Sequence, residues 1–336
     1  MMETYRKLLE HLPDVLALIV LDYCPDAEEG LGEEYENIDP EEGLEHACYG
    51  GFIDLVPKMI KAGAKNYDSG LYLSAENGHL EVVKKMFRLG ARDLNSALFG
   101  ACMGGHMLVV DYLMWQGADD YNRGYQGACV GGHLDIAKFM AEKGRVKERE
   151  GFELACYGGH LDIAKFIEPH EQSEALSWAC DGGHMKIIQY LIDLNFDDWN
   201  SGLFGACKGG NLRIIDLMID KGATDLDRGL FGAGIGGEVE SIEYIISKGA
   251  TDMNMGLMGA CMNGNIEIIK MIMDRGGNDW NSGLLYACKG GNLDACKLMV
   301  ERGADDFDAP FGMPLEKKVV RYLKSKKNSS IECIVS

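Results

Sequence analysis

Cysteine is the residue type with the clearest spacing in this sequence. Eight of the eleven cysteines fall at one position of a repeating pattern: Cys48, Cys102, Cys129, Cys156, Cys180, Cys207, Cys261 and Cys288. Thiolates could bind a metal or form disulfides, but the sequence has no CxxC pair. Neighbouring repeats should also lie ~10 Å apart, beyond the ~7 Å that a disulfide allows between Cα atoms. We therefore interpret the row as small buried hydrophobic residues in place of alanine.

Histidine forms a second row, and it could suggest metal binding: His79, His106, His133, His160 and His184. Two or more imidazoles would have to converge on one ion, and one histidine per repeat keeps them too far apart. We expect no metal site. The stretch from Gly232 to Gly237 satisfies G-x-G-x-x-G, but a dinucleotide site needs this motif after a strand and at the start of a helix. Here the motif is another copy of the repeat.

We find no other catalytic constellation, because G-x-S-x-G, H-E-x-x-H and a phosphate-binding loop are missing. We therefore expect neither enzyme activity nor a cofactor. The sequence has 53 Asp plus Glu against 33 Lys plus Arg, a formal charge of −20. That balance argues against a nucleic-acid partner, since such affinity rests on neutralising phosphates. We find no convincing signal peptide and no apolar run of ~18 residues, so we expect a cytoplasmic protein with reduced cysteines.

One internal repeat produces these rows. A glycine followed by His, Asn, Phe or Glu recurs every 27 residues, with a single step of 24: Gly51, Gly78, Gly105, Gly132, Gly159, Gly183, Gly210, Gly237, Gly264 and Gly291. In the copy that begins at Ser201, the spacing predicts a helix over 203–207, a left-handed glycine turn and a second helix over 212–219. Asn211 should cap the second helix. Asn200 or Ser201, and counterparts such as Asn254, should cap the first. Such helix–turn–helix units bury their apolar faces by stacking.

The repeats resemble ankyrin repeats over roughly Glu42 to Asp308. The run from Tyr125 to Leu134 fits Leu-x-x-Ala-[Ala/Cys]-x-x-Gly-His-Leu, with tyrosine in the leucine position, and Gly117 to Asp120 fits Gly-Ala-x-Asp. The usual period is about 33 residues, and the residues missing here fall where the family carries its β-hairpin finger. The shortened repeats are similar in style to those of large DNA viruses, which would place the protein in a host cytoplasm. The resemblance implies an all-α, ankyrin-like solenoid of about ten shortened repeats with terminal capping helices.

The resemblance also implies where a protein partner would bind. Without fingers, the contacts of the family fall on the residue that follows the Ala-[Ala/Cys] pair. Six of these ten positions are large and apolar in this chain: Tyr49, Met103, Val130, Tyr157, Ile235 and Met262. An exposed apolar strip of this kind marks a partner site. Closer packing of the shortened repeats would instead bury the same residues, and the sequence leaves both interpretations open.

The pattern breaks in the fourth and fifth copies. The fourth copy lacks the Gly-Ala-x-Asp loop, and it places Lys143, Arg145, Lys147 and Arg149 where the other loops are acidic. Breaks in a consistent pattern are expected at functional or strained sites. A bend in the solenoid is one interpretation, and a binding site for an anion or an acidic partner is the other.

The two ends fall outside the repeats at 43–309. Residues 1–24 precede an acidic linker at 25–42, and the stretch from His11 to Tyr23 is similar to the opening of F-box domains, which dock onto cullin-type ubiquitin ligases. The alternative is a helix that caps the repeats. Residues 310–336 predict a capping helix and a basic tail that ends in Cys333-Ile334-Val335-Ser336. These four residues fit C-a-a-X, which would place a farnesyl group on Cys333 and favour peripheral membrane association.

Three functions follow from these observations. The first is a non-catalytic scaffold that binds a protein partner through the repeat surface. The second is a ubiquitin-ligase substrate adaptor, in which ligase subunits bind the N-terminal stretch. The third is a prenylated, membrane-tethered scaffold. The sequence does not name the partner, because repeat folds present a generic surface and function depends on the residues placed on it.

Overall fold

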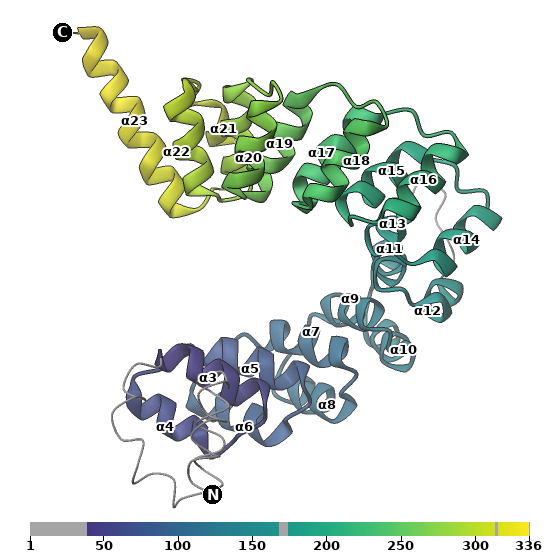
Figure 1. Cartoon of the computed structure of the whole chain (residues 1–336). Helices are drawn as coiled ribbons and strands as arrows, with labels where there is room; N and C mark the ends of the chain where they lie inside the picture. The colour runs from purple at the N-terminus through teal and green to yellow at the C-terminus, as the bar shows by residue number, and fades with distance from the viewer. Residues whose placement is uncertain (1–38, 168–173, 313–314, 336) are drawn as a thin grey trace, which may run out of the picture. The chain divides into compact units, whose positions relative to one another are not determined.

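The computed structural model describes residues 39–167, 174–312 and 315–335 (Figure 1). Across these ranges the chain forms twenty-one α-helices, α3 to α23, and a short 3-10 helix, with no strand. The predicted all-helical, repeat-like fold is confirmed. Backbone contacts divide the chain into two compact units, which meet in the sequence between Lys147 and Glu148. This boundary lies inside the segment where the repeat pattern breaks.

Each copy of the repeat contributes two helices. The first helices are α3 (Pro40–Tyr49), α5 (Tyr67–Glu76), α7 (Leu94–Gly104) and α9 (Tyr121–Gly131) in unit 1, and α11 (Glu148–Gly158), α13 (Ala175–Asp181), α15 (Trp199–Lys208), α17 (Leu226–Gly236), α19 (Met253–Asn263) and α21 (Trp280–Lys289) in unit 2. Helix α3 thus begins inside the range predicted as an acidic linker. Both helices of the copy at Ser201 form where the apolar spacing predicts them.

The second helices complete the copies. They are α4 (Leu55–Ala62), α6 (Leu80–Leu89), α8 (Met107–Trp115) and α10 (Leu134–Lys143) in unit 1, and α12 (Leu161–Phe166), α14 (Met185–Asp193), α16 (Leu212–Lys221), α18 (Val239–Ser247), α20 (Ile266–Asp274) and α22 (Leu293–Arg302) in unit 2. The 3-10 helix η2 (Ala309–Gly312) and helix α23 (Lys317–Val335) follow. Val319 and Leu323 of α23 are buried, and α23 contacts α22.

Seven of the first helices have an aspartate as N-cap and α5 has Asn66, in each case two residues before the position of Asn200 and Asn254 that was predicted for this role. Asp279 is the N-cap of α21, and its Oδ1 accepts from the backbone N–H of Ser282 at 3.0 Å. Asn254 lies within α19, where its Oδ1 accepts from the N–H groups of Asn278 and Asp279 in the next copy, at 2.8 and 2.9 Å. The prediction failed because Asn254 follows its own N-cap by two residues and reaches forward instead. This bond joins successive copies, and Asn95, Asn200 and Asn281 repeat it.

The turn between the two helices of a copy explains the glycine and histidine rows together. Gly78 has φ +77°, a backbone conformation that costs other residues about 1–2 kcal/mol. A Cβ at this glycine would also overlap the ring of His106 from the next copy. The ring of His79 contacts the equivalent glycine of the first copy, and its Nε2 lies 3.0 Å from the carbonyl oxygen of Tyr49. The histidines therefore join neighbouring turns.

The cysteine row lies in the core. All eight row cysteines are buried, and burial raises the pKa of seven of these thiols, Cys207 among them, to about 12. The exception is Cys288 of α21, whose Sγ lies 3.5 Å from the Sγ of Cys296 of α22. This contact lowers the pKa of Cys288 and, together with burial, raises that of Cys296. The sequence analysis considered only cysteines of neighbouring copies, so it missed this pair, in which both cysteines belong to one copy.

Candidate protein-binding surface

The residue that follows the Ala-[Ala/Cys] pair lies at the surface in all ten copies. We call these ten residues the contact row: Tyr49, Glu76, Met103, Val130, Tyr157, Asp181, Lys208, Ile235, Met262 and Lys289. None of them is buried. Tyr49 in unit 1 is 57% exposed and Tyr157 in unit 2 is 40% exposed, while Met103, Val130, Ile235 and Met262 are half-buried. The packing of the shortened repeats therefore leaves the predicted partner-binding residues accessible within each unit.

Close packing of the first helices keeps the contact row uncovered. In most copies the next residue is glycine, and it faces the carbonyl oxygen of the contact-row residue one copy earlier. A Cβ at Gly131 would overlap the carbonyl of Met103, and one at Gly236 would overlap the carbonyl of Lys208. Glycine thus lets the two helix backbones approach closely. The side chains of the contact row then extend beyond this junction.

Unit 2 adds a row of aromatic side chains that the sequence analysis missed. The rings of Phe204 on α15 and Phe231 on α17 stack with centroids 6.1 Å apart. Tyr286 on α21 meets Phe231 edge-on at 5.3 Å. Tyr286 stands at the position that Gly259 occupies in α19, so its ring has room to cross that helix. We call Phe204, Phe231 and Tyr286 the aromatic row. The 27-residue spacing of Phe204 and Phe231 was an available signal, whereas Tyr286 occupies the next position of the repeat and gave none.

Cationic groups lie over the aromatic row. The guanidinium of Arg228 is 5.6 Å from the centroid of Phe204, and the ammonium of Lys289 is 4.3 Å from that of Tyr286. Cation–π contacts of this kind contribute about 0.5–1 kcal/mol at exposed positions. This face of unit 2 therefore combines half-buried apolar side chains with positive charge, although the whole chain is strongly acidic. Such a face is suited to a segment that carries both apolar and carboxylate side chains.

The predicted basic cluster is shared between the two units. In unit 1, the ammonium of Lys143 lies 4.7 Å from the centroid of Phe139, while Arg145 and Lys147 are exposed. The backbone N–H of Lys147 donates to Asn122 Oδ1 at 2.8 Å. In unit 2, Arg149 Nε pairs with Glu153 Oε1 at 3.0 Å on the same helix. The anion site that the sequence offers here stays a prediction.

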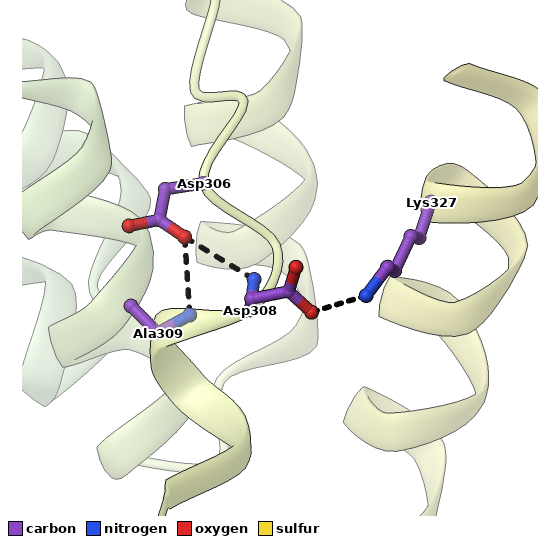
Figure 2. Close-up of polar contacts among 4 residues, drawn as sticks. All are labelled: Asp306, Asp308, Ala309 and Lys327. Atoms are coloured by element: carbon purple, nitrogen blue, oxygen red, sulfur yellow. Dashed lines mark hydrogen bonds and ion pairs between the residues drawn. The ribbon is translucent and has the colours of Figure 1, made fainter. Parts of the chain in front are cut away.

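An ion pair joins helix α23 to the preceding loop, which is held by hydrogen bonds of its own (Figure 2). Asp308 and Lys327 form an ion pair, and Asp306 Oδ1 accepts from the N–H groups of Asp308 and Ala309 at 3.2 and 3.1 Å. The backbone of α23 passes through position 333. The side chain of Cys333, however, lies outside the described part of the chain. The F-box-like stretch from His11 to Tyr23 lies outside it as well.

The described residues contain no group of three or more His, Cys, Asp or Glu side chains that could hold a metal ion. No helix among them combines the length and the apolar character that crossing a membrane requires. In comparisons with known proteins, no family model and no curated protein matches the chain.

Proposed function

We propose that this chain is a non-catalytic scaffold that binds a protein partner through the contact row. The observation that carries the proposal is that six apolar residues of this row stay accessible, because glycines hold the first helices together by their backbones. In each unit two neighbouring copies carry apolar residues in this row, Met103 with Val130 and Ile235 with Met262, and adjacent accessible apolar side chains of this kind are typical of a partner site. In unit 2 the aromatic row widens the same face.

We further propose that the repeats are shortened ankyrin-like repeats. Three features support this assignment. Each copy is a helix–turn–helix unit, its turn histidine or asparagine bonds to the backbone of the preceding copy, and the alanine of each Gly-Ala-x-Asp loop, such as Ala118 or Ala304, is buried. The absent finger leaves the contact row as the main binding element, and the cytoplasm is the proposed location.

Ile235 and Met262 offer a direct test. The chain itself places lysine at this position in the copies before and after them, at Lys208 and Lys289, so Ile235→Lys with Met262→Lys should fold normally. We expect the double variant to lose its specific partners in affinity capture from host cells with mass spectrometry. Val239→Lys is the matched control, because Val239 is 44% exposed on a second helix. The same captured set for all three chains would contradict the proposal.

Membrane tethering is a second proposed function, favoured by two observations. The C-a-a-X residues lie at the C-terminal end of α23, whose Lys317, Arg321 and Lys324 are exposed at a spacing that places them on one face. One prenyl chain binds a membrane weakly, and a basic face supplies the second attachment. Cys333→Ser should move the protein from the membrane to the supernatant fraction, and an unchanged distribution would contradict tethering. The ligase-adaptor function stays a prediction for residues 11–24.

A further inference from the structure

Helix α8 differs from every other second helix of the chain. Leu108 and Trp115 are 75% and 81% exposed, and they are the two most exposed large apolar residues in the described chain. All other copies place a charged residue at the position of Leu108: Asp54, Glu81, Asp135, Asp162, Lys186, Arg213, Glu240, Glu267 and Asp294. At the position of Trp115 they have Lys61, Arg88, Glu142, Pro169, Asp193, Asp220, Ser247, Asp274 and Glu301. The packing of the repeat therefore does not require apolar residues at the positions of Leu108 and Trp115.

Two exposed apolar residues of α8 and the half-buried Tyr112 form one surface, and the exposed Asp111 lies beside them. Leu108, Tyr112 and Trp115 follow one another at i, i+4 and i+7, so they share a face of the helix. The ring of Tyr112 lies 6.4 Å from that of Trp115 and 6.5 Å, edge-on, from that of Phe87 on α6. We call Leu108, Tyr112, Trp115 and Phe87 the α8 face. Its apolar stripe has the pattern by which one helix face binds an apolar segment.

The side of the α8 face toward α6 is basic. Helix α6 carries Lys84, Lys85 and Arg88, and Arg88 is exposed. Lys84 pairs with Glu81 at 2.6 Å, and the guanidinium of Arg92 lies 5.6 Å from the centroid of Phe87. An apolar stripe with a basic margin fits an occupant in which an apolar run is joined to an acidic one.

The chain contains such an occupant next to unit 1. Val15 to Leu21 is its longest apolar run, and the residues from 22 to 38 include seven carboxylates and no Lys or Arg. We propose that residues 11–38 bind the α8 face, with the run 15–21 on Leu108 and Trp115 and the following carboxylates along α6. The inference is independent of the partner proposed for the contact row.

Chain length and attachment favour this intramolecular contact. The eighteen residues from Leu21 to Asp39 can span up to about 60 Å. Helix α8 lies two copies beyond α3, a distance of about 20 Å at the usual helix–helix spacing. A tethered segment also acts at a high effective concentration, on the order of millimolar for a short linker. When residues 11–24 bind α8, they are not accessible to a ligase subunit, so the two occupancies exclude each other.

Isotope-mixed cross-linking of the full chain tests the proposal. Unlabelled and ¹⁵N-labelled protein are mixed and treated with a zero-length carbodiimide, which joins carboxylates to lysine amines. We expect links from carboxylates at 22–36 to Lys84 or Lys85, each with a single isotopic composition. Links of mixed composition would identify a second copy as the occupant and overturn the proposal. The absence of links to these lysines would overturn it too.

Substitutions in the full chain provide an independent readout. Leu108→Lys with Trp115→Arg installs the residues that α14 and α6 carry at these positions, so the repeat should fold normally. We expect this variant to lose the links, whereas Val239→Lys keeps them. In a second variant, Ile19→Asp, hydroxyl-radical oxidation of Trp115 should rise several-fold, while oxidation of half-buried Trp280 stays constant as the internal reference. Retained links in the first variant, or unchanged oxidation of Trp115 in the second, would overturn the proposal.

Discussion

The first and second helices of the repeat have similar lengths but pack in different ways. Neighbouring first helices meet backbone to backbone, because glycines such as Gly131 and Gly236 face the carbonyl groups of the preceding copy. Second helices pack through long apolar side chains, such as Val110 and Ile215, and most carry charged residues on the outer side. Where the backbone makes the contact, the adjacent side chain is no longer needed for packing. The contact row can therefore vary between apolar and charged residues without loss of the fold.

The largest expected effect in this comparison comes from Gly131→Ala. The new Cβ would overlap the carbonyl of Met103, and a backbone contact relaxes only when the two helices separate. Overpacking of this kind costs about 1–3 kcal/mol, more than the helix propensity of alanine restores. We expect faster amide hydrogen exchange in α7 and α9, measured by mass spectrometry.

Gly90→Ala is the matched control for this substitution. Gly90 ends α6 at φ +117°, and no neighbouring atom lies within 4 Å of its hypothetical Cβ. Alanine should therefore cost only the backbone strain there, about 1 kcal/mol. If both substitutions accelerate hydrogen exchange in α7 and α9 equally, close backbone contact is not what sets the packing of the first helices apart from that of the second helices.

An intermediate effect is expected for Asn254→Ala. Its Oδ1 accepts from two N–H groups of the next loop, so alanine leaves both donors to solvent. Net hydrogen-bond contributions are about 0.5–1.5 kcal/mol each, and solvent exposure places this pair at the low end. Exchange at the loop around Asn278 should increase. Asn254→Asp keeps the acceptor and serves as the control, which should exchange like the parent chain.

The smallest effect concerns pH. Hydrogen bonds from the Ser96 hydroxyl and N–H hold the pKa of Asp93, the N-cap of α7, below its usual value. The ionised carboxylate therefore stabilises the fold above the unfolded-state pKa, and this contribution is lost as the pH falls through the lower folded-state pKa. Asp93→Asn keeps a capping acceptor but does not titrate. Thermal melts from pH 6 to pH 3 should show a shallower decline for this variant, and parallel curves would rule out the contribution.

Particular residues show how far the sequence could be read. Gly210 and Asn211 were assigned correctly, because a left-handed glycine and an N-cap are local features of a few consecutive residues. Asn254 was wrongly predicted to be an N-cap, since it lies inside α19 and its hydrogen-bond partner is 24 residues ahead. The contact between Cys288 and Cys296 was missed because it depends on how α21 and α22 face each other. The exposure of Trp115 could not be predicted from the sequence, because it depends on which side of α8 the helices of neighbouring copies leave uncovered.

The sequence by itself determined the period, the two helices of each copy and the burial of the cysteine row. Helical periodicity and glycine conformation are properties of the local backbone, so residue order is enough to specify them. Only the tertiary structure decided that the contact row stays exposed or half-buried, that aromatic side chains meet across α19 and that α8 presents an apolar face. These features depend on how closely neighbouring helices approach each other. That distance is set by contacts between residues one repeat apart, and the order of residues in the sequence does not show which of them meet.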